Sequence, residues 1–229
     1  MTPDTGRHVV GETTPTGLSN QIYQALRSRI QTCDLLPGSD LSEKQLMDEH
    51  GYGRTPLREA LLALQRDGLV EIFPRKGMRV TPFTEKSIND VYQLRKLLEP
   101  AVMSSYVSMY SKSDLLDFAR RFRETSIADI VEHYELDIAF HTFLVSIADN
   151  EAMSRIHSEL MSHVFRLAMY ALVTGASHPE QNNPEHLAVV EALLRENEQE
   201  AKDALIFHIN HSLIVSLNAV RERNEDASA

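Results

Sequence analysis

The chain has 229 residues, of which 42% are hydrophobic, with nine glycines, nine prolines and a single cysteine. This length favours one large or two small domains, and the composition excludes collagen-like, low-complexity and disulfide-stapled architectures. The longest uninterrupted apolar run extends over seven residues, from Leu167 to Val173, whereas a membrane-spanning helix needs roughly 20. Because no charged-then-apolar leader opens the chain, the sequence predicts a soluble cytoplasmic protein with no membrane contact.

The net charge of −10 is unevenly distributed along the chain. Residues 1–82 contain ten basic and ten acidic side chains, whereas residues 83–229 contain 13 basic and 23 acidic ones, so the whole excess lies in the C-terminal part. Residues 54–79 hold six basic groups and three acidic ones. This local excess of positive charge is compatible with a directed DNA contact. From charge alone, however, a solvated surface of mixed charge is the simpler interpretation.

The first fifteen residues are polar and show no periodicity, which predicts a disordered tail. From Leu18 onward, apolar side chains recur every four residues and predict an amphipathic helix that ends before the Pro37-Gly38 turn. Ser42 then begins a capping box for a short helix that extends to about His50.

A third helix is expected from Gly53 to about Asp67. Glycine is an acceptable N-cap residue, and an apolar stripe along this segment forms a buried face. Arg54 and Arg58 are four residues apart and therefore share a different side of the helix.

Two short strands, 69–73 and 78–81, enclose a basic turn. Three helices followed by a β-hairpin with a basic tip are the layout of a winged helix-turn-helix. A helix N-terminus that carries two arginines on one face can enter the DNA major groove, where Arg pairs with guanine. Lys76 and the backbone at Gly77 can then reach phosphate. A double-stranded DNA operator is therefore the expected partner.

The stretch LLPGSDLSEKQLMDEHGYGRTPLREALLALQRDGLVEIFPRKGMRV resembles the N-terminal domain of the GntR family of bacterial regulators. The resemblance implies DNA contacts at positions on the second helix, the third helix and the hairpin, namely Lys44, Arg54, Thr55, Arg58 and Gly77. Gly53 departs from the family pattern, which usually has Ser or Thr there. The missing hydroxyl removes an N-cap and a phosphate contact, and we expect this to weaken or retune operator binding.

No alternating strand pattern occurs after Thr84, and the apolar spacing predicts helices at about 85–109, 112–126, 130–148, 151–174, 184–196 and 199–223. These segments form an antiparallel bundle that is large enough for its own core. The sequence thus predicts a mostly α protein, with a tail at 1–15, a winged helix-turn-helix domain at 16–82 and an all-α domain at 83–224. The resemblance to GntR-family regulators implies effector binding and dimerisation for this last domain.

Histidines in this second part suggest a metal site. Asp137 and His141 lie one turn apart on one helix, and His186 and His208 lie on two later helices. A carboxylate and three imidazoles that converge from three helices can hold a divalent metal. Spacing alone leaves the simpler alternative open, because buried hydrogen-bonded or surface histidines are more common than ligands.

The stretches VYQLRKLLEP, ELDIAFH, PEHLAVVEAL and FHI resemble the FCD effector domain of the FadR-like branch of the family. In many such domains an Asp, a His four residues later and two further His bind a metal, and these positions match Asp137, His141, His186 and His208. Zinc is the first expectation, with nickel, iron or manganese as alternatives. The other histidines of this part are then structural or exposed: His133, His157, His163 and His211.

Four protein ligands leave a metal one or two open positions, which suit a small carboxylate or hydroxy-acid effector. Arg95 and Arg166 are candidates to clamp its carboxylate. An intrahelical pair with Glu99 is an equally good interpretation of Arg95, and a structural role is favoured for Arg166.

The sequence therefore predicts a ligand-responsive transcription regulator that acts as a homodimer on a near-palindromic operator. A metal-dependent enzyme on the helical domain is one alternative, but no HExxH or other catalytic motif supports it, and we expect no enzyme activity. A regulator that senses the metal itself, without an organic effector, is the other alternative.

Overall fold

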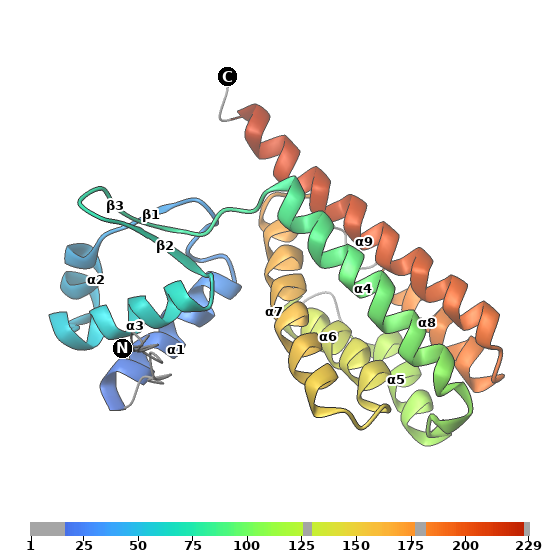
Figure 1. Ribbon diagram of the computed structural model, residues 1–229. Helices are drawn as coiled ribbons and strands as arrows, with labels where there is room; N and C mark the ends of the chain where they lie inside the picture. The colour runs from blue at the N-terminus through green and yellow to red at the C-terminus, as the bar shows by residue number, and fades with distance from the viewer. Residues whose placement is uncertain (1–16, 126–129, 177–181, 227–229) are drawn as a thin grey trace, which may run out of the picture. The chain divides into compact units, whose positions relative to one another are not determined.

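The computed structural model describes residues 17–125, 130–176 and 182–226 (Figure 1), so the predicted tail at 1–15 lies outside the described residues. The contacts divide the chain into two compact units. Residues 17–30 and 38–81 form a winged-helix unit, and residues 31–37 and 82–226 form a helical unit.

The described elements of the winged-helix unit are α1 (Gly17–Gln31), β1 (Asp40–Leu41), α2 (Glu43–His50), α3 (Arg54–Arg66), β2 (Val70–Phe73) and β3 (Gly77–Val80). The hydroxyl of Ser42 accepts a hydrogen bond from the backbone N–H of Gln45 and caps α2. This is half of the predicted capping box, because the Gln45 side chain donates to Glu49 and not back to Ser42. The apolar stripes of α1 and α3 are buried and form the core, with Ile22, Leu26 and Leu57 at 1% exposure or less.

The three strands form an antiparallel sheet in the order β1-β3-β2. Sequence periodicity missed β1, because two residues are too few to show alternation. The β2–β3 turn contains Arg75 and Gly77 with φ of 64° and 105°. Glycine tolerates this left-handed backbone where other side chains are strained, so the hairpin tip depends on Gly77.

The described elements of the helical unit are α4 (Glu85–Ser105), a short 3-10 turn η1 (Val107–Met109), α5 (Lys112–Glu124), α6 (Ile130–Ser146), α7 (Glu151–Val173), α8 (Asn182–Leu194) and α9 (Glu198–Asp226). The mostly α fold with a winged helix-turn-helix is therefore confirmed, and the helix boundaries differ from the predicted ones by a few residues. No described helix is both long and apolar enough to cross a membrane.

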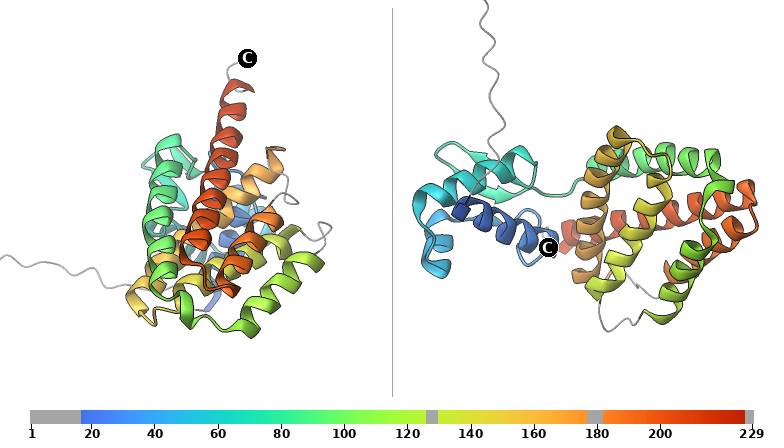
Figure 2. Two further views of the ribbon diagram at one scale, coloured as in Figure 1. Left: turned by 90° about the vertical axis from the view of Figure 1, so that its right-hand side faces the viewer. Right: turned by 90° about the horizontal axis from the view of Figure 1, so that it is seen from below.

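Helices α4 and α9 lie side by side in the views of Figures 1 and 2. Glu85 at the start of α4 pairs with Arg221 of α9, and Lys96, later on α4, donates to Asn210, earlier on α9. The two helices are therefore antiparallel. Helix α8 packs on α9 and on α5, and α6 packs on α7. The helices that carry the four candidate metal ligands, α6, α8 and α9, thus belong to one core.

The segment 31–37 comprises the last residue of α1 and the six residues after it, and it belongs to the helical unit. Gln31 Nε2 donates a 2.7 Å hydrogen bond to Ser162 Oγ of α7. Cys33 is 5% exposed within the helical core, and its Sγ lies 3.8 Å from the backbone oxygen of Arg166. The sequence had assigned this segment to the 16–82 domain, and tertiary packing on α7 gives it to the other unit.

Candidate metal centre

Three helices bring the four predicted ligands together. Asp137 and His141 lie one turn apart on α6, His186 lies in the first turns of α8, and His208 lies on α9. Each offers one ligand atom, and these atoms lie within 4.8 Å of one another. All four side chains are buried, with Asp137 the most exposed at 7%. The spatial convergence predicted from the sequence is present.

The separations between the ligand atoms fit a shared cation. His141 Nε2 lies 3.1 Å from His208 Nε2 and 3.7 Å from Asp137 Oδ1, and His186 Nε2 lies 3.3 Å from Asp137 Oδ2. Two ligands at about 2.1 Å from one tetrahedral ion are about 3.4 Å apart. Among the described residues, Nδ1 of His186 has no hydrogen-bond partner, and its Nε2 has only the 3.3 Å contact with Asp137. A buried polar atom that lacks hydrogen bonds is costly, and a metal ion would satisfy Nε2.

The pKa shifts favour the protonation states that metal ligands require. Burial alone would raise the pKa of Asp137, but contact with His186, His141 and His208 outweighs burial and holds this pKa below its usual range. Burial lowers the pKa of His208 well below its usual value, and the neighbouring His186 and His141 lower it further. An ionised carboxylate beside neutral imidazoles is ready to bind a divalent cation.

Two carboxylates that the sequence analysis did not assign to the site contact the ligands from outside. Glu99 Oε2 lies 2.7 Å from His141 Nδ1, and Glu185 Oε2 lies 2.9 Å from His208 Nδ1. Glu99 is completely buried, and its pKa lies well below its usual value, because the opposing effect of burial is outweighed by Arg95 and His141. The members of these two pairs are 42 and 23 residues apart in the sequence, so no local pattern could predict the contacts.

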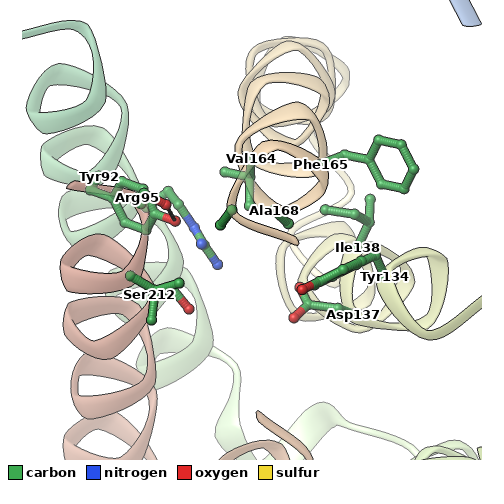
Figure 3. A pocket seen from close by; sticks show the side chains of 12 residues that line it. Tyr92, Arg95, Tyr134, Asp137, Ile138, Val164, Phe165, Ala168 and Ser212 are labelled. Atoms are coloured by element: carbon green, nitrogen blue, oxygen red, sulfur yellow. Dashed lines mark hydrogen bonds between the residues drawn. The ribbon is translucent and has the colours of Figure 1, made fainter. Parts of the chain in front are cut away.

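A pocket lies beside the cluster (Figure 3), and Asp137 belongs to both. Its polar lining comes from α4, α6 and α9, and its apolar lining comes largely from α7. The pocket has a cavity volume of about 30 Å³, which is room for about two water molecules. The lining residues used below are Tyr92, Arg95, Tyr134, Asp137, Val164 and Ser212.

The two predicted effector-binding arginines lie in different places. Arg95 lines the pocket and also pairs with Glu99 through a 2.8 Å contact between Nε and Oε1, so both interpretations of this residue fit the structure. Arg166 is not among the pocket-lining residues. Its guanidinium lies 4.6 Å from the ring centroid of Phe83, and burial lowers its pKa to about 10. These contacts favour a packing role for Arg166.

The six predicted DNA contacts are exposed in the winged-helix unit: Lys44 on α2, Arg54, Thr55 and Arg58 on α3, and Lys76 and Gly77 at the hairpin tip. Arg58 is held by Glu43 of α2, whose carboxylate lies 3.0 Å from Nε, although the arginine side chain remains 59% exposed. Gly53 is the N-cap of α3 and provides no side-chain hydrogen bond, as its chemistry requires. Its φ of −68° is open to any residue.

A winged helix-turn-helix with an exposed basic tip, followed by a helical bundle with a buried Asp-His cluster, is the architecture of a class of DNA-binding proteins with a second, helical domain. The sequence matches the model of the bacterial regulatory proteins of the gntR family over residues 18–80, and the FCD domain model over residues 90–211. The second match alone covers more than half of the chain. The protein belongs to the GntR family of bacterial transcription regulators, with an FCD domain.

Curated relatives are similar over most of their length. The chain is 28% identical over 213 residues to the HTH-type transcriptional repressor RspR of Escherichia coli, covering 91% of this chain and 92% of the relative. It is 29% identical over 217 residues to the repressor NanR of an Enterobacter species, covering 84% of this chain and 83% of the relative. The family and these relatives are transcription regulators, which favours regulation over catalysis.

Two solved structures share the fold. A GntR regulator from Rhodococcus has a TM-score of 0.71 at 20% identity, with 89% of this chain and 99% of that chain covered. McbR/YncC of Escherichia coli has a TM-score of 0.69 at 16% identity, with 89% of this chain and 98% of that chain covered. At these identities the comparison establishes the shared fold.

Proposed function

We propose that this regulator binds a small carboxylate or hydroxy-acid at a divalent metal centre in its helical unit, and that this effector changes its affinity for operator DNA. The observation that carries the proposal is the double role of Asp137, which belongs to the four-ligand cluster and also lines the neighbouring pocket. A ligand in the pocket would therefore reach the metal. Operator binding places this function in the cytoplasm.

The metal would be held by Asp137, His141, His186 and His208. Zinc suits this set of three imidazoles and one carboxylate, and nickel, iron or manganese are the alternatives. A bound ion would supply a Lewis acid for an oxygen atom of the effector. The protein supplies a buried site that excludes competing water from the four donors.

The effector would be oriented by the polar groups of the pocket. Arg95 offers a cation for a carboxylate, while the hydroxyls of Tyr134 and Ser212 face the same space and can bond to further oxygens (Figure 3). The pocket has room for about two water molecules, so an organic acid must move side chains to enter. We assign no effector contact to Arg166, because it does not line this pocket.

The winged-helix unit would bind the operator through Lys44, Arg54, Thr55, Arg58, Lys76 and Gly77. Arg54 and Arg58 stand at the start of α3, where a recognition helix contacts base edges. Arg58 must share or leave its contact with Glu43 to reach DNA. Lys76 and Gly77 at the hairpin tip would bind the backbone.

We further propose that the protein is a homodimer, which would present two α3 helices to a near-palindromic operator. Large apolar side chains remain exposed on the adjacent helices α4 and α9: Leu94, Leu97, Phe207 and Ile214. Light scattering after size exclusion tests this proposal. We expect Leu97→Glu to give monomers, while Leu116→Glu, at an exposed leucine of α5, leaves the dimer intact. Monomeric wild-type protein would contradict the proposal.

A thermal-shift screen of small organic acids tests the effector, with wild-type and Asp137→Asn proteins measured after chelation and again after zinc is restored. An acid at 100 times its Kd stabilises the fold by about 2.7 kcal/mol. We expect a stabilising acid to act only on zinc-loaded wild-type protein. Hits should then change the affinity for an operator selected from random DNA. Stabilisation that survives chelation would contradict a metal-bound effector.

A second candidate is a regulator for which the metal itself is the signal, favoured by the small free volume of the pocket. Operator binding measured during a zinc titration, with no organic acid present, separates the two. A zinc-dependent change in affinity without acid supports the sensor, and a change that requires both supports the first proposal.

A further inference from the structure

We propose that Glu99 and Glu185 are positioning residues of the metal centre. Each accepts a hydrogen bond from Nδ1 of a histidine ligand, His141 or His208, and so turns the bare Nε2 of that ring toward the other ligands. This inference rests on the metal-binding function proposed above.

The contact between His141 and Glu99 defines the tautomer of the ring. An ionised carboxylate only accepts hydrogen bonds, so the 2.7 Å contact between Nδ1 and Glu99 Oε2 requires the proton on Nδ1. Arg95 Nη2 lies 3.2 Å from the same nitrogen. If Nδ1 accepted from Arg95, its lone pair would face the carboxylate at 2.7 Å, which is repulsive. The neutral ring therefore carries its lone pair on Nε2.

A similar contact occurs at His208, where Nδ1 lies 2.9 Å from Glu185 Oε2. Burial raises the pKa of Glu185, with His211 opposing it, and in its ionised form this carboxylate only accepts, which places the proton of His208 on Nδ1. As a result, the two Nε2 atoms of His141 and His208 face each other at 3.1 Å with both lone pairs directed inward. Two facing lone pairs repel each other unless a cation lies between them. Carboxylates on the outer nitrogens of metal-bound histidines fix ring orientation and raise ligand basicity, and these two glutamates have that placement.

Both glutamates use their two oxygens for different partners. Oε1 of Glu99 accepts from Arg95 Nε at 2.8 Å, and Oε1 of Glu185 accepts from His211 Nδ1 at 2.5 Å. A glutamine in either position has one acceptor oxygen and one NH₂ group that only donates. It must therefore lose one of the two hydrogen bonds, although its shape is unchanged.

The third ligand is held in another way. The ring of His186 stacks on Phe122, with centroids 4.6 Å apart and an interplanar angle of 3°. Among the described residues, its Nδ1 has no hydrogen-bond partner, so no carboxylate orients this ring from outside the cluster. Substitution of the two glutamates should thus affect His141 and His208 and leave the orientation of His186 in place.

Zinc affinity provides the first test, measured by competition with a chromophoric chelator. We expect Glu99→Gln and Glu185→Gln each to weaken zinc binding about 10–100-fold. Glu191→Gln is the matched control, because Glu191 lies on α8 with Glu185 but its side chain is 52% exposed and pairs with Arg123. Zinc affinities equal to the wild-type value in both variants would overturn the inference.

The tautomer itself provides the second test, read from long-range proton–nitrogen NMR spectra of zinc-loaded protein. Wild-type His141 and His208 should carry the proton on Nδ1. In Glu185→Gln the signature should change at His208 and persist at His141, a selectivity that general loosening of the fold would not produce. Protons on Nε2 in the wild-type protein would overturn the inference.

The two proposals fail in different ways. Wild-type protein that binds no zinc would overturn the proposed metal function. Wild-type protein that binds zinc as tightly as both glutamine variants would leave the metal function standing and overturn the positioning role. Because Glu99 is completely buried, Glu185→Gln, whose side chain is 12% exposed in the wild type, keeps the test valid if Glu99→Gln does not fold.

Discussion

The two units of the protein differ in whether their functional charged residues are exposed or buried. In the winged-helix unit, the charged residues proposed to bind DNA are exposed, and the interactions around them are surface pairs such as Arg58 with Glu43. In the helical unit, buried Arg95 pairs with buried Glu99, and Glu99 and Asp137 contact buried histidines. Replacement of a charged residue should therefore have different effects in the two units.

In the winged-helix unit, exposed charged residues should affect DNA binding but not folding. In the helical unit, buried charged residues should affect both the metal site and the stability of the fold. A surface ion pair contributes about 0–1 kcal/mol, so an exposed arginine can be replaced with little effect on folding. Removal of one member of a buried pair leaves an uncompensated charge. Four measurements can sharpen or break this comparison.

The largest effect should come from the buried pair. Arg95→Met leaves Glu99 buried without its guanidinium partner, and we expect the free energy of unfolding to fall by about 3–5 kcal/mol. Arg54→Met, at an exposed position, should change it by less than about 0.5 kcal/mol. Urea denaturation of both variants checks this. Equal losses would remove the distinction between the units.

Operator binding should show the reverse pattern. Arg58→Ala should weaken binding to a selected operator by about 1–3 kcal/mol and relax base preference at one position of each half-site. Fluorescence anisotropy with single-base operator variants measures both effects. Because the Arg58 pair with Glu43 is a surface contact, the melting temperature should hardly change. Undiminished affinity would remove Arg58 from the interface.

Acid should destabilise the helical unit of metal-free protein. The pKa values of His141 and His208 are lowered, with burial as the largest cause, so the unfolded chain takes up these protons first, near pH 6.5. The unfolded state then binds more protons than the folded state, and stability falls as pH drops below about 6.5. Urea unfolding between pH 8 and 5 should show this loss, and His208→Gln should reduce its slope. A flat wild-type profile would contradict the lowered pKa values.

The smallest effect should come from Gly53. A Cβ at this position would lie 3.4 Å from Pro56 Cγ, and the φ of Gly53 is negative, so a side chain is tolerated. Gly53→Ser adds an N-cap hydroxyl to α3, which should stabilise the protein by a few tenths of a kcal/mol. The same hydroxyl should tighten operator binding through a phosphate contact. Gly53→Ala serves as the control without the hydroxyl, and weaker binding by Gly53→Ser than by this control would contradict a phosphate contact.

Local patterns in the sequence predicted most of the fold. Periodic apolar residues located the helices, and the capping box at Ser42 located the start of α2. The two-residue strand β1 was missed, because Asp40 and Leu41 owe their pairing to β3, 37 or more residues later. Such a contact leaves no local pattern.

Some residues of the candidate site could likewise be predicted from the sequence, and others depend on tertiary packing. The spacing of Asp137 and His141 is a local signal, and a family resemblance supplied His186 and His208. Glu99 was noted only as a partner of Arg95 four residues away, whereas its contact with His141 depends on the packing of α4 on α6. For Arg166 the sequence favours a structural role, and the tertiary structure supplies a partner for it in Phe83.

The assignment of residues 31–37 to the helical unit has a practical consequence. The chain leaves the winged-helix unit after Ile30, returns to it at Gly38 and leaves it again after Thr81. A single cut near residue 82 therefore does not divide the molecule along its structural boundary. A fragment that begins at residue 83 would lack Cys33 from its core. A fragment that ends at residue 82 would contain residues 31–37 without the helical unit on which they pack.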